Sequence, residues 1–214
     1  MNKVKKLPNS PDKKKFHENM NKVLQKLEEK GIELEKLNAV EVFGREGDWH
    51  TVAYCNKVKS MEIWEINESY KKNLEKNCPN AIIRILDSIE NILNYNKKKK
   101  FNFIVIDNPM SNYGKNDSYC EHFNIIENIE NISTKNPIIV FNVNRNPFNL
   151  NQNTLWKKRR EQFYKTNNTS KLTIDFLLQF YQKLFEDRKW KTIFSFFLVR
   201  HEYLDYLVFK LKKT

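Results

Sequence analysis

The chain has 214 residues, of which 40% are hydrophobic and 13% aromatic, and its formal net charge at pH 7 is +12. This length predicts one domain, and the apolar content suffices for a buried core, which excludes a globally disordered chain. The positive charge would suit a nucleic acid, an anionic membrane surface or an anionic substrate. The sequence is also rich in lysine and asparagine, as proteins from AT-rich genomes are, so the charge carries reduced weight as evidence.

Residues 1–36 are predicted to form a basic tail followed by a helix. In the helical part, apolar residues recur at intervals of three and four, which is the spacing of an amphipathic helix. Its expected buried residues are Phe16, Met20, Val23, Leu24 and Leu27.

From residue 37 onward, short apolar runs alternate with polar segments of helical pattern. Runs this apolar suit strands that are covered on both faces, and strands alternating with helices predict a parallel sheet with right-handed crossovers. The expected strands are residues 39–43, 61–66, 81–86, 101–107 and 137–143. The expected helices between them are residues 48–58, 68–77, 87–96 and 118–132.

The last third of the chain departs from this alternation. Residues 172–190 predict a helix, and residues 191–202 and 203–213 then follow with almost no connection. Two strands joined so tightly must be antiparallel, because a parallel pair needs a crossover of about a dozen residues. The prediction is therefore an α/β, Rossmann-like three-layer sandwich over residues 37–214. Its sheet has seven strands, mostly parallel with one antiparallel C-terminal strand, and residues 144–170 form an insertion.

Two of the four glycines, Gly44 and Gly47, follow the first expected strand. In an open parallel sheet, ligands bind beyond the carboxyl ends of the strands, where the strand order reverses. A glycine there lets the backbone bend sharply and come close to a ligand. The alternative is a tight turn without a ligand. Asp48 is expected to cap the helix that follows.

Acidic residues stand at the ends of the next strands. Glu65 closes the second strand, where a carboxylate can accept hydrogen bonds from a ribose diol, although it could also be only a solvated charge. Asp87 and Ser88 follow the third strand and could meet an adenine edge, although aspartate is also a favoured N-cap. The fourth strand ends in Asp107, followed by Asn108-Pro109-Met110.

This set resembles the class I S-adenosylmethionine-dependent methyltransferases, over about residues 37–213. The first-strand segment is similar to the family's acidic-x-Gly-x-Gly motif, and the acids after the second and third strands are similar to its ribose-binding and adenine-side acids. The resemblance implies S-adenosylmethionine as cofactor. The residues that it assigns to the cofactor are Glu41, Gly44, Gly47, Glu65, Asp87 and Ser88.

The resemblance also implies an acceptor site after the fourth strand. Asp107, Asn108 and Pro109 stand where the family carries its catalytic motif, and Met110 and Tyr113 would border the acceptor, with Tyr113 supplying an aromatic ring. Methyl transfer chiefly requires that the nucleophile lie in line with the methyl group. The alternative for this segment is a rigid loop that ends the strand.

The insertion contains a run of basic residues among aromatic ones. Trp156 precedes four basic residues, and Phe163 and Tyr164 follow them. As a lid, this segment would place Lys157 and Arg159 on an anionic or nucleotide-bearing substrate. A surface helix whose aromatic residues pack inward is the alternative, and it is slightly favoured.

The predicted function is a methyl transfer to an unknown acceptor, either a small molecule or sugar or a nucleic acid. The alternative is a non-catalytic binding module on the same fold, associated with nucleic acid or a larger complex. An enzyme using NAD or a nucleotide sugar is disfavoured, because the dinucleotide pattern lacks one glycine.

The three cysteines, Cys55, Cys78 and Cys120, are far apart, without a Cys-x-x-Cys motif. They predict neither a disulfide framework nor a zinc site, and Cys120-x-His122 offers too few ligands, so no metal is expected. Reduced thiols favour a cytoplasmic protein. The charged N-terminus is unlike a signal peptide, and no window approaches the roughly 20 apolar residues of a membrane span.

Overall fold

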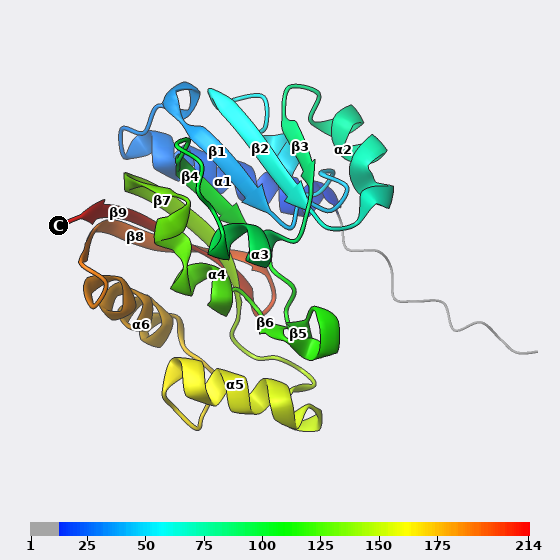
Figure 1. Cartoon of the computed structure of the whole chain (residues 1–214). Helices are drawn as coiled ribbons and strands as arrows, with labels where there is room; N and C mark the ends of the chain where they lie inside the picture. The colour runs from blue at the N-terminus through cyan, green and yellow to red at the C-terminus, as the bar shows by residue number, and fades with distance from the viewer. Residues whose placement is uncertain (1–12) are drawn as a thin grey trace, which may run out of the picture.

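The computed structural model describes residues 13–214, so the predicted basic tail of residues 1–12 lies outside the described residues. The main sheet has seven strands in the order β3-β2-β1-β4-β7-β9-β8 (Figure 1). The strand β9 runs antiparallel to both of its neighbours, and the other pairs are parallel, as the tight connection before it predicts. The strands are β1 (Asn38–Val42), β2 (Ser60–Glu65), β3 (Ile82–Ile85), β4 (Phe101–Ile106), β7 (Ser133–Asn144), β8 (Trp190–His201) and β9 (Leu204–Lys213).

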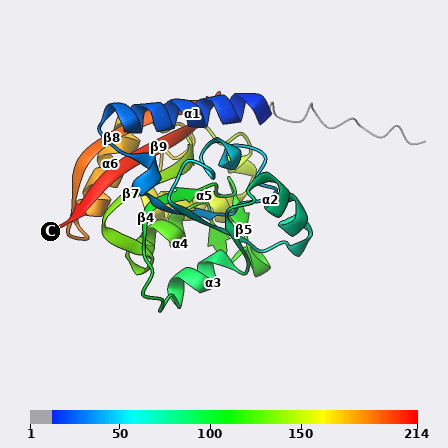
Figure 2. The ribbon, with the colours of Figure 1, turned by 90° about the horizontal axis from the view of Figure 1, so that it is seen from above.

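Helices cover both faces of this sheet, which gives the predicted three layers (Figure 2). One face packs against α1 (Lys13–Glu29) and α2 (Lys71–Asn77). The other face packs against α3 (Ser88–Leu93), α4 (Phe123–Glu127), α5 (Thr154–Tyr164) and α6 (Ile174–Glu186). Within residues 13–214, every helix is too short or too polar to span a lipid bilayer.

The helix α1 forms as its spacing predicts. All five predicted apolar residues are buried, and all but Phe16 share a core with the sheet residues of that face. The helix ends at Glu29, and Gly31 beyond it has a φ of +78°, a conformation that glycine adopts without strain. The described part of the N-terminal segment is thus packed onto the domain.

The predicted helix over residues 48–58 is absent, and this prediction is wrong. The structure forms a single 3₁₀ turn, Thr51–Ala53, between irregular stretches. Asp48 caps no helix and instead pairs with Lys13 at the start of α1. The cause lies in three buried side chains of this segment, which turn inward onto a carboxylate of β1 and hold the backbone off a helical path. They are His50, Thr51 and Tyr54.

A small hairpin that the pattern does not indicate follows β4. It pairs β5 (Asn112–Tyr113) with β6 (Tyr119–Cys120), antiparallel, as a separate two-stranded sheet. Residues 118–132, expected as one helix, therefore begin as a strand and become helical only from Phe123. The hairpin lies between the carboxyl ends of the strands and α5 (Figure 1).

Candidate functional site

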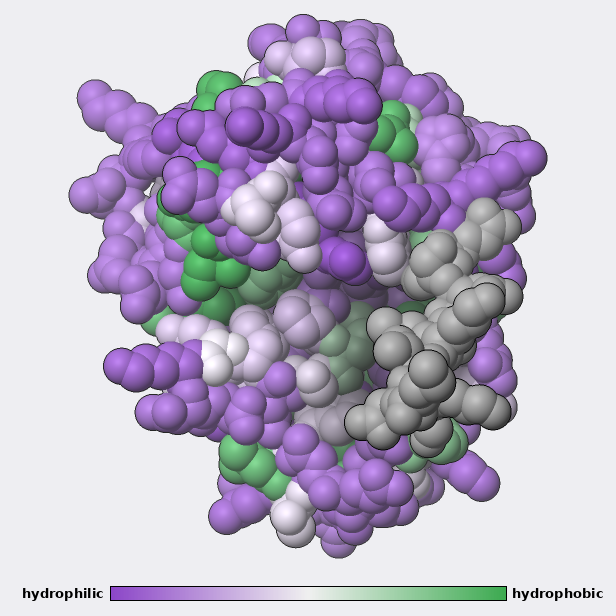
Figure 3. Space-filling view, turned by 90° about the vertical axis from the view of Figure 1, so that its right-hand side faces the viewer, coloured by the Kyte–Doolittle hydropathy of each residue, from purple (hydrophilic) through white to green (hydrophobic). Residues whose placement is uncertain are grey.

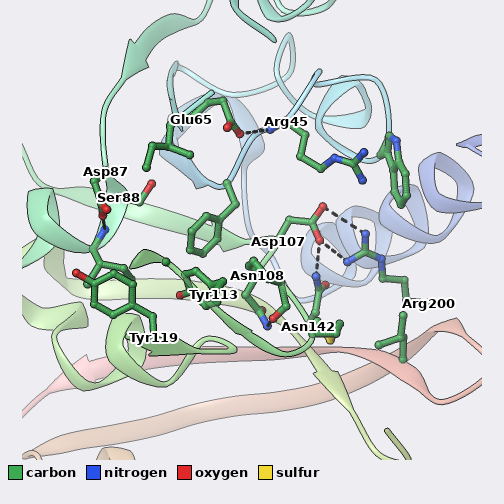
Figure 4. A pocket seen from close by; sticks show the side chains of 18 of the residues that line it. Arg45, Glu65, Asp87, Ser88, Asp107, Asn108, Tyr113, Tyr119, Asn142 and Arg200 are labelled. Atoms are coloured by element: carbon green, nitrogen blue, oxygen red, sulfur yellow. Dashed lines mark hydrogen bonds and ion pairs between the residues drawn. The ribbon is translucent and has the colours of Figure 1, made fainter. Parts of the chain in front are cut away.

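A cavity of about 900 Å³ opens at the carboxyl ends of the parallel strands. Figure 3 shows the hollow as a patch of pale, less hydrophilic surface in a mostly hydrophilic face. Side chains from the ends of β2, β3, β4 and β8 line it, together with the start of α1. The sequence-predicted residues that line the cavity are Glu65, Asp87, Ser88, Asp107, Asn108, Pro109, Met110 and Tyr113 (Figure 4). Those that do not are Glu41, Gly44, Gly47, Lys157 and Arg159.

Glu65 ends β2 with its carboxylate at the cavity wall and only 5% of its surface exposed. One carboxylate oxygen accepts the backbone N–H of Arg45 (2.7 Å), and the other accepts that of Asn67 (2.8 Å). Each carboxylate oxygen has a further lone pair, because an ionised carboxylate offers about four acceptor sites. Glu65 therefore braces the loop after β1 and can still accept hydroxyl donors from a ligand.

Asp87 caps the helix that follows it and also lies in the cavity wall. Its Oδ1 accepts the backbone N–H groups of Ile89 (2.8 Å) and Glu90 (3.1 Å), which makes it the N-cap of α3. Asp87 also lines the cavity, next to the buried Ser88. The second carboxylate oxygen is not used by the cap, so a ligand donor can reach it without disturbing the helix.

The loop after β1 differs from its predicted form. Left-handed φ angles occur at Phe43 (+69°), Arg45 (+48°) and Gly47 (+70°), so they alternate along the chain. Counted from Glu41, an acidic-x-Gly-x-Gly pattern would put glycine at 43 and 45, where this chain has bulky residues. Both of these side chains line the cavity. The loop therefore takes left-handed angles at 43 and 45, where the pattern would have glycine, with side chains at both positions.

Gly44 is explained by packing against β2. A Cβ at this position would lie 2.1 Å from the Cγ2 of Ile63, and its φ angle is not left-handed. At Gly47 a Cβ would lie 2.9 Å from the Cδ2 of Leu74. Both glycines thus let the loop sit close to β2 and α2, which is the tight-turn alternative.

We expect Gly44→Ala to destabilise the fold by about 1 to 3 kcal/mol, the usual cost of overpacking a core. Urea unfolding measures the change. The clash involves the Cγ2 of Ile63, so the cost of Gly44→Ala should shrink in an Ile63→Ala background and persist in an Ile63→Val background, which keeps that methyl group. An equal cost in all three backgrounds would contradict the packing explanation.

Glu41 lies beneath the cavity, 1% exposed, and does not line it. Its carboxylate bonds to His50 Nε2 (3.1 Å), Thr51 Oγ1 (2.9 Å) and the Tyr54 hydroxyl. Burial, together with the Glu41 charge, raises the pKa of Tyr54 well above its usual value, so this phenol stays a donor. The visible role of Glu41 is to anchor the 48–58 segment to the sheet.

Glu41, His50 and Asp107 place potential ligand atoms within 4.8 Å of one another, which raises the question of a metal. The donors are already engaged, however: Glu41 holds three partners, and His50 Nδ1 meets the Tyr206 hydroxyl at 3.0 Å. The guanidinium of Arg200 also brings a positive charge against Asp107. These residues suit an internal hydrogen-bond network better than a cation, and we derive no chemistry from a metal here.

Asp107 is held by an ion pair that the sequence does not reveal. Arg200 from β8 meets both of its oxygens, with Nη2 3.3 Å from Oδ2, and Asn142 from β7 donates to Oδ1 (Figure 4). Burial alone would raise the pKa of Asp107, but the charge of Arg200 and these hydrogen bonds lower it to about 2. Asp107 is therefore ionised at neutral pH and is a poor proton acceptor.

This lowered pKa predicts a specific pH dependence of stability. An unfolded aspartate titrates near pH 3.9. Since the folded pKa is below that value, the carboxylate stabilises the fold above about pH 4 and loses this contribution as the pH falls toward 2. We expect the difference in unfolding free energy between the wild type and Asp107→Asn to shrink by about 1 kcal/mol between pH 6 and pH 3. Urea unfolding at the two pH values measures it, and a constant difference would contradict the ion pair.

Two buried amide oxygens next to Asp107 have no hydrogen-bond partner among residues 13–214. Asn108 is 4% exposed and Asn142 1% exposed, and the Oδ1 atom of each is buried without a hydrogen bond. Their amide nitrogens are occupied, by the carbonyl of Pro109 (3.2 Å) and by Asp107, which fixes which atom is the oxygen. Both residues line the cavity. Buried acceptors nearly always find a donor, so the site offers two places for an N–H or O–H group of a bound molecule.

The basic helix α5 does not roof the cavity. Arg159 donates to the carbonyl of Tyr119 (3.0 Å) and to Asn112 Oδ1 (3.2 Å), so it clamps the β5–β6 hairpin. Lys157 lies 4.0 Å from Glu161 on the helix surface. A substrate contact of Arg159 and Lys157 stays a prediction. In the structure Arg159 contacts the hairpin, and Lys157 lies on the helix surface beside Glu161.

Sequence reasoning missed several cavity residues from outside the expected motifs. Phe16 on α1, Trp49, Arg200 on β8 and Asn142 on β7 all line the cavity. No motif marks them, because they come from four separate segments that only the folded sheet brings together. Only the strand topology could have indicated Asn142 and Arg200, because β7 and β8 end at the same edge of the sheet as β4.

No protein-family model matches the chain, and no curated protein matches it. Solved structures do match. Magnesium protoporphyrin IX methyltransferase from Synechocystis PCC 6803, with bound SAH, has a TM-score of 0.58 and 10% identity, covering 94% of this chain and 84% of that one. The N-methyltransferase NodS from Bradyrhizobium japonicum WM9, with S-adenosyl-L-homocysteine, has a TM-score of 0.56 and 11% identity, covering 97% and 90%. At such identities the likeness establishes the fold alone, which this chain shares with these methyltransferases.

Proposed function

We propose that this chain is an S-adenosylmethionine-dependent methyltransferase that acts on an N–H or O–H group. One observation carries the proposal. Carboxylates at the ends of β2, β3 and β4 line one cavity, at the point where the strand order reverses between β1 and β4. That edge is where open parallel sheets bind ligands.

The cavity suits the cofactor in size and in the order of its groups. Its volume, about 900 Å³, is near the top of the ~300–1,000 Å³ range of small-molecule sites, so cofactor and a small acceptor can share it. Asp87 beside the apolar Ile66 and Ile89 would take the adenine, and Glu65 the ribose hydroxyls. When bound, S-adenosylmethionine would supply a methyl group that its sulfonium already activates.

The protein's part in the reaction would then be to position the acceptor. The unpaired oxygens of Asn108 and Asn142 would accept hydrogen bonds from its amine or hydroxyl, which orients a nucleophilic lone pair. Asp107, held ionised by Arg200, would favour a polar or cationic group nearby rather than remove its proton. A small molecule fits the cavity; a single nucleic acid base is the other methyl acceptor that these hydrogen-bond acceptors and aromatic rings could hold.

A non-catalytic module on this fold remains the second candidate, because Phe43 and Arg45 occupy left-handed positions of the cofactor loop. Such a module would have kept the sheet while losing cofactor affinity. As to location, the buried thiols of Cys55, Cys78 and Cys120, which form no disulfide bond, favour the cytoplasm for either candidate.

Isothermal titration with S-adenosylmethionine and S-adenosylhomocysteine tests the proposal on the full chain. The methyltransferase predicts that both bind at micromolar to submillimolar concentration. Absence of binding at about 1 mM of either ligand, which corresponds to less than about 4 kcal/mol of binding free energy, would favour the non-catalytic module.

A further inference from the structure

Four side chains from three segments stack in one column at the rim of the cavity. The guanidinium of Arg45 lies 4.5 Å from the centre of the Trp49 ring, and Trp49 stacks on Phe16 with centroids 4.9 Å apart and planes 15° apart. The guanidinium of Arg200 lies 4.9 Å from the Phe16 ring on the next level. The column thus joins the loop after β1, the start of α1 and the end of β8, and all four residues line the cavity.

The two arginines of this column differ in their charge partners. Arg200 is neutralised by Asp107. For Arg45, by contrast, no carboxylate of residues 13–214 forms an ion pair with the guanidinium, and the ring of Trp49 is its visible contact. Arg45 is exposed at the cavity mouth, so its charge is solvated and available to an anion.

The backbone of Arg45 fixes where this charge can act. Its N–H donates to Glu65, so the side chain starts at the carboxylate that would hold the ribose. Figure 4 shows Asp87 and Ser88 on one side of Glu65 and the Arg45 side chain extending to the other, above the Asp107–Arg200 pair. With adenine at Asp87 and ribose at Glu65, the amino-acid end of the cofactor would extend toward Arg45.

We propose that Arg45 binds the α-carboxylate of the cofactor's amino-acid end, and that Trp49 and Phe16 position its guanidinium. This inference rests on the proposed function. It also gives a reason for the left-handed φ of +48°, which costs a residue with a Cβ roughly 1 to 2 kcal/mol compared with glycine. Strain of this kind concentrates at functional sites, where a side chain is needed at a position that the backbone favours for glycine.

The test compares two ligands that differ only in the amino acid. 5′-Methylthioadenosine has the adenosine and thioether of S-adenosylhomocysteine but neither its carboxylate nor its ammonium group. We expect Arg45→Gly to weaken S-adenosylhomocysteine about ten- to a hundredfold, as expected for one lost charge-assisted contact, and to leave 5′-methylthioadenosine within about twofold. Glycine fits the left-handed backbone, so this variant should fold.

Three further variants complete the design. The control for the loss of one positive charge is Lys158→Ala, on the exposed surface of α5. Alanine is used there because glycine would also weaken the helix. Arg45→Lys keeps the charge without the planar fork and should recover part of the affinity for S-adenosylhomocysteine. Trp49→Leu removes the stacking ring and should weaken S-adenosylhomocysteine alone, by less than Arg45→Gly does.

The outcomes separate this inference from the proposed function. If the wild type binds neither ligand, the proposed function fails, and this inference fails with it. If it binds both and Arg45→Gly leaves the affinity for S-adenosylhomocysteine unchanged, or weakens both ligands equally, Arg45 does not bind the carboxylate and only this inference is overturned. Selective loss of S-adenosylhomocysteine supports it.

Discussion

Replacing Glu65 with alanine is expected to lower the affinity for S-adenosylhomocysteine by about a hundredfold or more. The reason is that a carboxylate accepting the two ribose hydroxyls would form charge-assisted hydrogen bonds, each contributing about 1.5 to 3 kcal/mol. Isothermal titration of the full chain measures the loss. The loss should extend to 5′-methylthioadenosine, because that ligand keeps the ribose, and this sets Glu65 apart from Arg45.

The structure adds a second effect that the experiment must separate. Glu65 also accepts the backbone N–H groups of Arg45 and Asn67, so alanine loosens the cofactor loop as well. The matched control is Glu62→Gln on the same strand. Glu62 is equally buried and pairs with Arg84 and Lys99, but it does not line the cavity.

Glu62→Gln should therefore lower the free energy of unfolding with little effect on ligand affinity, whereas Glu65→Ala should lower the ligand affinity strongly whatever its effect on stability. Urea unfolding of both variants without ligand provides the comparison. Equal loss of affinity in the two variants would mean that the strand, rather than the Glu65 carboxylate, supports binding.

Much of the fold was predictable because each strand of the sheet has a recognisable pattern of residues in its own short stretch of sequence. The five parallel strands are apolar runs, since both faces of the sheet are covered. The antiparallel strand followed from a connection too short for a crossover. Glu65, Asp87 and Asp107 then meet at one cavity, because residues that end parallel strands share an edge of the sheet.

The unpredicted parts depend on contacts between distant segments. The 48–58 segment has a helical spacing of apolar residues, yet Glu41 captures its polar side chains and overrides that pattern. Sequence likewise gave no sign that Phe43 and Arg45 would take left-handed angles, since both residue types normally avoid them. The Arg200–Asp107 pair joins residues 93 positions apart, so no local spacing could indicate it.

The basic helix shows how a local pattern can be ambiguous. Trp156, Arg160 and Tyr164 recur every four residues and are all buried, which agrees with the favoured alternative of aromatic residues packing inward. The charge of Arg160 would predict an exposed side chain, because an arginine without a charge partner is rarely buried. Its partner, Glu121, lies in the turn before α4, and both side chains are 0% exposed.

Arg160→Ala is expected to destabilise the fold by about 3 to 5 kcal/mol, because removing one member of a buried ion pair leaves the other charge unpaired. Arg160 also donates to the carbonyls of Asn144 (2.9 Å) and Thr169 (3.2 Å), which tie the two ends of the 144–170 segment together. Glu121 would keep only the indole N–H of Trp156 (2.7 Å). Urea unfolding of the variant measures the change.

The control is Lys158→Ala, which removes an exposed positive charge from the same helix and should leave unfolding unchanged. Replacing Arg160 and Glu121 together with methionine should restore much of the lost stability, because the buried charge is then gone as well. If Arg160→Ala unfolds like Lys158→Ala, the pair does not hold the segment. If the large loss and its rescue are both seen, Arg160 serves the fold through its pair with Glu121, and a substrate must find its contacts at other residues.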